Sequence, residues 1–142
     1  MKELVLKASD ETLYTVLDEI RNTLSENGCD EDAATQIAIS AEEVFVNIAH
    51  YAYGGEAGEA IVDIELTTDP KIIRITFKDR GIPYNPLEKE DPDTDLSADE
   101  RAVGGLGIFM VKTMMDNVEY RYEDGQNILT IEKNIEKITE KP

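Results

Sequence analysis

The chain contains very little of several residue types that build common functional sites. Cys29 is its only cysteine, His50 is its only histidine, and tryptophan is absent. One cysteine excludes a disulfide within the chain and a metal site built from several cysteines. One histidine likewise excludes a two-histidine metal site. A run of about 18 apolar residues is also missing, so no segment is predicted to span a membrane.

Basic residues are scarce as well. Lys and Arg together number 14 against 31 Asp and Glu, which gives a formal net charge of −17. A surface this acidic repels nucleic acids and anionic membranes, so neither is expected as a direct partner. The charge can serve solubility alone or provide a docking face for a basic partner, and both readings stay open. The N-terminal residues are too polar for a signal peptide, so we expect a cytoplasmic protein.

The residues that are present suffice for one globular domain over residues 1–142, because 41% of them are hydrophobic. Residues 3–7 alternate as a short strand, and apolar spacing predicts helices over about 10–27 and 30–53. The second helix carries a polar stripe beside its apolar face. It also has apolar Ile39 and Val46 on a third side, so we expect it to be central and covered on two sides.

Alternating residues predict four further strands or strand ends downstream. Residues 62–66 and 73–77 each bury one face, and by parity Asp79 falls on the inward face of the second. Residues 118–123 and 127–134 flank an Asp-Gly hairpin signal, and a helix is predicted from residue 105 to about 116. The acidic stretch 87–103 has no core period and is expected to be a lid. The total predicts an α+β two-layer sandwich with a mixed, mostly antiparallel sheet and helices on one face.

Glu43 and Asn47 are separated by one helical turn, so their side chains meet on one face of the second helix. Such a pair is often a solvated stripe. On a covered helix, however, both groups need partners, and a Mg²⁺ ion with phosphates would supply them. Glu43 could then accept a proton from an attacking hydroxyl.

Asp79 ends its strand just before Arg80-Gly81. An Asp here can cap a turn, or its half-buried carboxylate can accept the exocyclic amine of adenine. Gly81 would let the backbone approach the base closely.

The segment Gly104-Gly105-Leu106-Gly107 opens the predicted helix after the lid. Glycines before a helix expose free amides, and the positive helix end favours phosphate, although close packing against a neighbour explains such glycines equally well. Arg101 is the only basic residue between Glu90 and Lys112. It can contact a phosphate or pair locally with Asp99 or Glu100.

Taken in order, Glu43-Val-Phe-Val-Asn47, the stretch from Asp79 to Pro86, and the glycine segment 104–107 resemble the N, G1 and G2 boxes of the GHKL nucleotide-binding superfamily. Within that superfamily the chain is most similar to the stand-alone anti-sigma factor serine/threonine kinases. The resemblance implies a Bergerat-type ATP-binding fold with ATP and Mg²⁺ as cofactors.

The resemblance also implies roles for single residues. Glu43 would be the general base and Asn47 the Mg²⁺ ligand. Arg101 would contact the γ-phosphate, and the nucleotide would further contact Asp79, Gly81, Gly104, Gly105, Leu106 and Gly107.

The family's usual activity gives the functional expectation. It is an ATP-dependent serine/threonine kinase that phosphorylates a STAS-type anti-anti-sigma factor, with a sigma factor as a further partner and a homodimer as the assembly. The alternative is a nucleotide-binding partner-switch module without phosphotransfer, and the sequence does not decide between the two.

Overall fold

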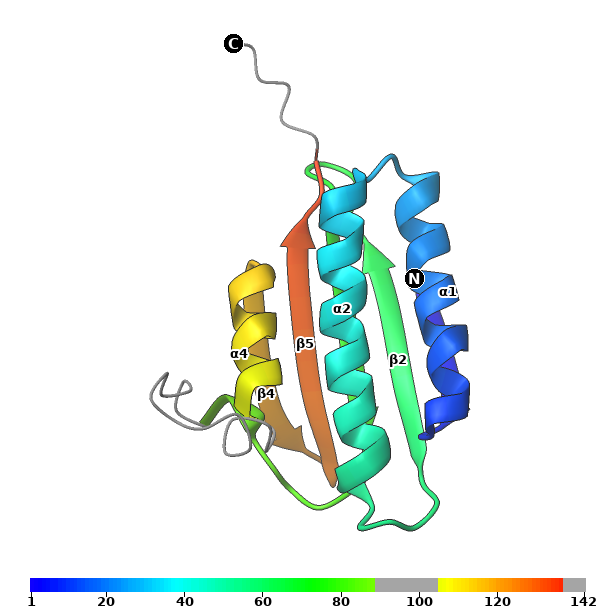
Figure 1. The fold of residues 1–142 in the computed structure, drawn as a ribbon, viewed down its shortest axis with the longest axis vertical. Helices are drawn as coiled ribbons and strands as arrows, with labels where there is room; N and C mark the ends of the chain where they lie inside the picture. The colour runs from blue at the N-terminus through cyan, green and yellow to red at the C-terminus, as the bar shows by residue number, and fades with distance from the viewer. Residues whose placement is uncertain (89–104, 137–142) are drawn as a thin grey trace.

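A computed structural model of the chain describes residues 1–88 and 105–136. Helices α1, α2 and α4 lie side by side on one face of a five-stranded sheet (Figure 1). This is the predicted two-layer α+β sandwich. Most of the predicted lid, together with Arg101 and Gly104, lies outside the described residues, and the side chains at 105 and 106 do too.

The sheet is antiparallel at every neighbouring pair, in the order β1-β2-β3-β5-β4. The mostly antiparallel pairing is therefore confirmed, but no neighbouring pair of the described strands is parallel, so the sheet is not mixed as expected. Its hydrophobic side chains alternate, so that one face packs on the helices and the other carries charged residues. The strands are β1 (Lys2–Lys7), β2 (Glu59–Leu66), β3 (Ile72–Asp79), β4 (Asn117–Glu123) and β5 (Gln126–Asn134).

Helix α2 begins at a capping residue. The carboxylate of Asp30 accepts a hydrogen bond of 2.7 Å from Ala33 N and so caps α2. A π-helical turn, η2, directly continues α2. The helical segments are η1 (Asp10–Thr12), α1 (Leu13–Glu26), α2 (Glu31–Asn47), η2 (Ile48–Ala52), η3 (Pro86–Glu88) and α4 (Gly105–Met114). No helix in the described ranges is long and apolar enough to cross a membrane.

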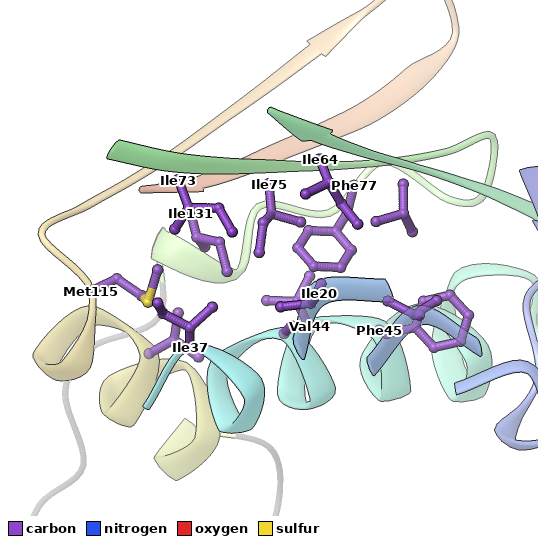
Figure 2. Packing of buried hydrophobic residues seen from close by; sticks show 14 of the residues in the cluster. Ile20, Ile37, Val44, Phe45, Ile64, Ile73, Ile75, Phe77, Met115 and Ile131 are labelled. Atoms are coloured by element: carbon purple, nitrogen blue, oxygen red, sulfur yellow. The ribbon is translucent and has the colours of Figure 1, made fainter. Parts of the chain in front are cut away.

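The core fills the space between the sheet and α2. Phe77 and Ile75 of β3 point toward Val44 and Ile37 of α2, and all four are buried (Figure 2). Burial of such side chains stabilises the fold by about 1.5–3 kcal/mol each. The same packing turns the side of α2 that carries Ser40 toward α4. Ser40 Oγ lies 3.9 Å from Met114 Sδ of that helix.

Helix α2 is central, as predicted, because α1 and α4 flank it (Figure 1). The expected cover over its third side is wrong at Ile39, which is 40% exposed, whereas Val46 packs partly against the core. The physical reason is that α1 and α4 cover the two flanks of α2, so the ridge facing away from the sheet stays in solvent.

Two local predictions are confirmed at the ends of the strands. Asp124 and Gly125 both adopt positive φ, 55° and 77°, in the turn that joins β4 to β5. Asp79 lies on the inward face at the end of β3 and is only 6% exposed. A carboxylate therefore stands in a row of otherwise apolar core positions.

Candidate functional site

A cavity of about 440 Å³ lies between the C-terminal end of α2 and the ends of the strands. Its walls are mostly apolar, and the polar side chains of Asn47, Asp79 and Asn127 line it from α2, β3 and β5. Such a cavity suits a flat, partly apolar ligand with a few polar edges. The lining residues are Val44, Asn47, Ile48, Tyr51, Ala52, Phe77, Asp79, Ile82, Pro83, Tyr84, Pro86, Ile108, Tyr120, Asn127 and Leu129.

The carboxylate of Asp79 is held in place by two donors on one oxygen. Gly81 N and Asn127 Nδ2 each donate to Asp79 Oδ1 at 2.9 Å. Among residues 1–88 and 105–136, no group donates a hydrogen bond to the second oxygen, Oδ2. Asp79 also lines the cavity. The turn-capping role and the ligand-binding role proposed from the sequence are therefore compatible. Oδ1 can cap the turn while Oδ2 accepts a hydrogen bond from a ligand.

Asn127 and Tyr120 are members of the site that the sequence analysis did not identify. Asn127 is 7% exposed and lies opposite Asp79 in the β3–β5 register. The sequence did contain a signal for Asn127, because it falls on the same inward-facing side of its strand as Leu129. A polar residue among buried apolar ones needs hydrogen-bond partners. Tyr120 donates its hydroxyl proton to Asn127 Oδ1. Burial and, further, the charge of Asp79 raise the pKa of Tyr120, so the phenol remains a donor at neutral pH.

The loop after β3 packs tightly on the end of η2. Ile82 N donates to Ala52 O at 2.9 Å, and a Cβ on Gly81 would lie 2.0 Å from the same oxygen. The hydroxyl of Tyr53 accepts from Arg80 N at 2.9 Å. Gly81 is thus required for backbone contact between this loop and the helix end. That contact fixes the distance between Asp79 and the helix that carries Asn47.

Glu43 and Asn47 lie one turn apart on α2 but have different surroundings. Asn47 lines the cavity. Glu43 is half-buried and packs against Gly107 in the first turn of α4, where an added Cβ would lie 2.0 Å from Glu43 Oε2. Gly105 and Leu106 form the start of the same helix.

Of the nine predicted site residues, the structure brings five into one region, places Gly105 and Leu106 at the start of α4, and leaves two outside its description. Asp79 and Gly81 lie at one end, and Glu43, Asn47 and Gly107 lie toward α4. The positions assigned to Arg101 and Gly104 stay sequence predictions.

His50 does not take part in the cavity. Its Nε2 lies 2.8 Å from Asp10 Oδ1, and both side chains are largely exposed. This pair joins the end of η2 to the start of η1 and is a local surface contact.

The donor set fits a metal ion only if the ligand itself supplies most of the oxygens. Among residues 1–88 and 105–136, no three His, Cys, Asp or Glu side chains form a metal-binding group. Asn47 offers one amide oxygen at the cavity wall. Mg²⁺ commonly binds through one or two protein oxygens together with phosphates and water, so a nucleotide-bound Mg²⁺ ion suits this site.

Comparison with protein families places the site in context. The family model described as histidine kinase-like ATPase domain matches residues 6–133. A serine-protein kinase RsbW of Listeria monocytogenes is 26% identical over 108 residues, covering 74% of this chain and 69% of that protein. A serine-protein kinase RsbW of Bacillus cereus is 22% identical over 129 residues, covering 89% of this chain and 81% of that protein.

Solved structures share the same fold. The RsbU and RsbW domains of a Mycobacterium tuberculosis protein align with a TM-score of 0.63 at 17% identity, covering 95% of this chain and 33% of that longer chain. A chain of the SiaB–SiaC complex from Pseudomonas aeruginosa aligns with a TM-score of 0.61 at 16% identity, covering 94% of this chain and 89% of that chain.

Proposed function

Because this chain belongs to the histidine kinase-like ATPase family, we propose that it is an ATP-dependent protein kinase that phosphorylates a serine or threonine of a protein partner. The observation that carries the proposal is the polar layout of the cavity. A buried carboxylate with one uncommitted oxygen, that of Asp79, stands at one end, and Asn47 stands on the α2 wall. Glu43 lies one turn further along α2, beside the first turn of α4.

The Asp79 end is proposed to hold adenine. Oδ2 of Asp79 is the oxygen left to accept a hydrogen bond from an exocyclic amine, since Oδ1 already accepts two. The apolar walls, which include Phe77 and Leu129, suit the flat faces of a purine. Gly81 keeps the loop against the helix end, so the mouth of the cavity keeps its width.

The α4 end is proposed to hold the phosphates. ATP supplies the phosphoryl group, and Mg²⁺ neutralises the negative charge of its phosphates. Asn47 would give its amide oxygen to the metal. The first turn of α4, from Gly105 to Gly107, would present backbone amides, and a phosphate is favoured at such a helix start.

Glu43 is proposed as the general base. Its carboxylate lies at the junction of α2 and α4, next to the proposed phosphate end. In that position it would accept the proton of the attacking hydroxyl of the partner protein. Arg101 and Gly104 are kept as proposed phosphate contacts on the sequence argument alone.

The partner is proposed to be a STAS-domain anti-anti-sigma factor, with a sigma factor as a second partner and a homodimer as the assembly. The support is the similarity to proteins named serine-protein kinase RsbW. An acidic chain of this kind is suited to protein partners rather than to nucleic acid, given its net charge of −17.

A second candidate is a nucleotide-binding switch that holds a partner without transferring phosphate. The contact between Glu43 and α4 leaves this open. A carboxylate beside the start of a helix also stabilises that helix electrostatically, with no catalytic role.

The deciding experiment incubates the purified protein with Mg²⁺, γ-labelled ATP and a STAS-domain protein encoded by the same genome. We expect label on the partner, and loss of that label with Glu43→Gln, which keeps the size of the side chain and removes the base. Glu42→Gln, a neighbouring exposed position on α2, is the matched control and should leave transfer intact.

Nucleotide binding is measured in parallel by calorimetry. ATP binding without labelled partner in the wild type would favour the switch without phosphotransfer. Absence of nucleotide binding would contradict both candidates.

A further inference from the structure

Asn127 has an unusual position for a polar side chain. It lies on the inward row of β5, in line with Leu129 and Ile131, and is only 7% exposed. Directly across the β3–β5 pair stands Asp79, the other buried polar residue of the cavity. Two polar side chains in a core row cost free energy unless their hydrogen bonds are made.

Every hydrogen-bonding position of the Asn127 carboxamide is used inside the protein. Nδ2 donates to Asp79 Oδ1 at 2.9 Å and to Ile82 O at 3.0 Å. Oδ1 accepts from Tyr84 N at 3.1 Å and from the hydroxyl of Tyr120. A primary carboxamide has two donors and room for about two acceptor bonds, so none is left for a ligand.

The orientation of this carboxamide is fixed by its partners. Rotation by a half turn would place the amide oxygen against Asp79 Oδ1 and Ile82 O, and the amide nitrogen against the Tyr84 N–H. All three contacts would become repulsive. One side chain therefore joins the end of β3, the loop 82–84 and β4 in a single arrangement.

We propose that Asn127 is a positioning residue for nucleotide binding, which orients Asp79 so that Oδ2 alone faces the cavity and fixes the position of the loop 82–84 beside it. The inference rests on the proposed function, because it names the residue that prepares the proposed adenine end. Asn127 lines the cavity, yet it acts through Asp79 and the loop and not through the ligand.

The test replaces Asn127 with a group of the same shape and opposite hydrogen-bonding character. In Asn127→Asp, a carboxylate oxygen replaces the donor that faced Asp79 and the Ile82 carbonyl. The titratable groups in hydrogen-bonding contact with the side chain of residue 127 are Asp79 and Tyr120, and Tyr84 lines the same cavity. Tyr122 and Glu88 act on Tyr120. Two carboxylates in contact cannot both stay ionised cheaply, so one proton is taken up at a higher pH than usual, and that proton restores a hydrogen bond between them.

The measurement is the Kd of ATP by calorimetry from about pH 8 to about pH 5.5, over which the shared proton of such a pair is taken up. We expect Asn127→Asp to bind ATP about tenfold or more weakly at the alkaline end, because two buried acceptors then face each other and Asp79 loses the donor that orients it. The ratio of the Kd of Asn127→Asp to the Kd of the wild type should fall toward one as the pH decreases. Asn22→Asp, which adds the same charge at an exposed position of α1, should follow wild type throughout.

The outcomes distinguish a failure of the role proposed for Asn127 from a failure of the proposed function. A wild type that binds no nucleotide overturns the proposed function, and the inference with it. A wild type that binds, beside an Asn127→Asp protein whose affinity ratio is one or does not change with pH, overturns the inference alone.

If circular dichroism shows Asn127→Asp unfolded at alkaline pH, Tyr120→Phe takes its place, since it removes one anchor of the carboxamide and keeps the ring. A several-fold weaker Kd is then expected, and an unchanged Kd overturns the inference.

Discussion

The carboxylate of Glu43 and the backbone of Gly107 fill adjoining space between α2 and α4. A methyl group on Gly107 would lie 2.0 Å from Glu43 Oε2 and 2.2 Å from its Cδ, which is closer than real atoms approach. Residue 107 must therefore lack a side chain if Glu43 is to keep this position. The glycine predicted to contact phosphate has a second physical reason to be there.

The first prediction follows from this contact. Gly107→Ala should leave α4 formed, because alanine is favoured over glycine inside a helix by about 1 kcal/mol. It should displace the flexible Glu43 side chain and slow phosphotransfer about a hundredfold, the order expected when a reacting group moves by an ångström. The measurement is the rate of label transfer to the partner. Thr113→Ala, at an exposed position of α4, is the control, and equal rates in the two variants would contradict the argument.

The second prediction concerns Asp79. In Asp79→Asn the amide oxygen can stay in the place of Oδ1, where Gly81 N and Asn127 Nδ2 donate, but an amide nitrogen then replaces Oδ2 and presents a donor to the cavity. The hydrogen bond proposed from the adenine amine is lost, at a cost of about 1–3 kcal/mol. The Kd of ADP, measured by calorimetry, should therefore rise about tenfold or more. Asp18→Asn, an exposed change on α1, removes the same charge and should bind as wild type.

The third prediction concerns the loop contact at Gly81. An added Cβ would meet the carbonyl oxygen of Ala52 at 2.0 Å and its carbon at 2.5 Å, and backbone atoms cannot move aside easily. Gly81→Ala should lower the free energy of unfolding by about 1–3 kcal/mol, as overpacking does. Urea unfolding checks this. Ile82→Ala shortens a neighbouring side chain that is 64% exposed, and a similar loss there would show that the close approach is not the cause.

The fourth prediction uses Cys29. Burial, and then the charges of Asp30 and Glu31, raise the pKa of this thiol above its ordinary value. A raised pKa means a smaller thiolate fraction at any given pH, and the thiolate is the reactive form. Alkylation by iodoacetamide should therefore be slower in the folded protein than in guanidinium. Its pH midpoint should lie higher in the folded state, and a lower midpoint would contradict the assigned cause.

Local sequence patterns predicted most of the secondary structure. The start of α2 near residue 30, the Asp124-Gly125 turn and the inward parity of Asp79 are all present as expected. Each depends on a few neighbouring residues, so the sequence contains the whole signal. The exposure of Ile39 could not be predicted from neighbouring residues. It depends on how closely α1 and α4 approach each other across the outer side of α2.

The candidate site was predicted in part. Glu43, Asn47 and Asp79 stand out because polar groups in apolar rows are visible in a sequence. Asn127 was missed although its parity was available. Its importance comes from partners far away in the chain, namely Asp79, Ile82 and Tyr120, which only strand pairing brings together.

The sequence by itself determined the elements, the acidic surface and the polar residues that could form a site, because these follow from local periodicity, capping and composition. The tertiary structure alone decided which of these residues meet. It placed Asn127 across from Asp79, set Gly81 against Ala52, and brought Gly107 so close to Glu43 that a side chain at residue 107 would displace the Glu43 carboxylate. The physical reason is range: periodicity acts over one or two helical turns, whereas close approach and saturated hydrogen bonds depend on how whole strands and helices pack.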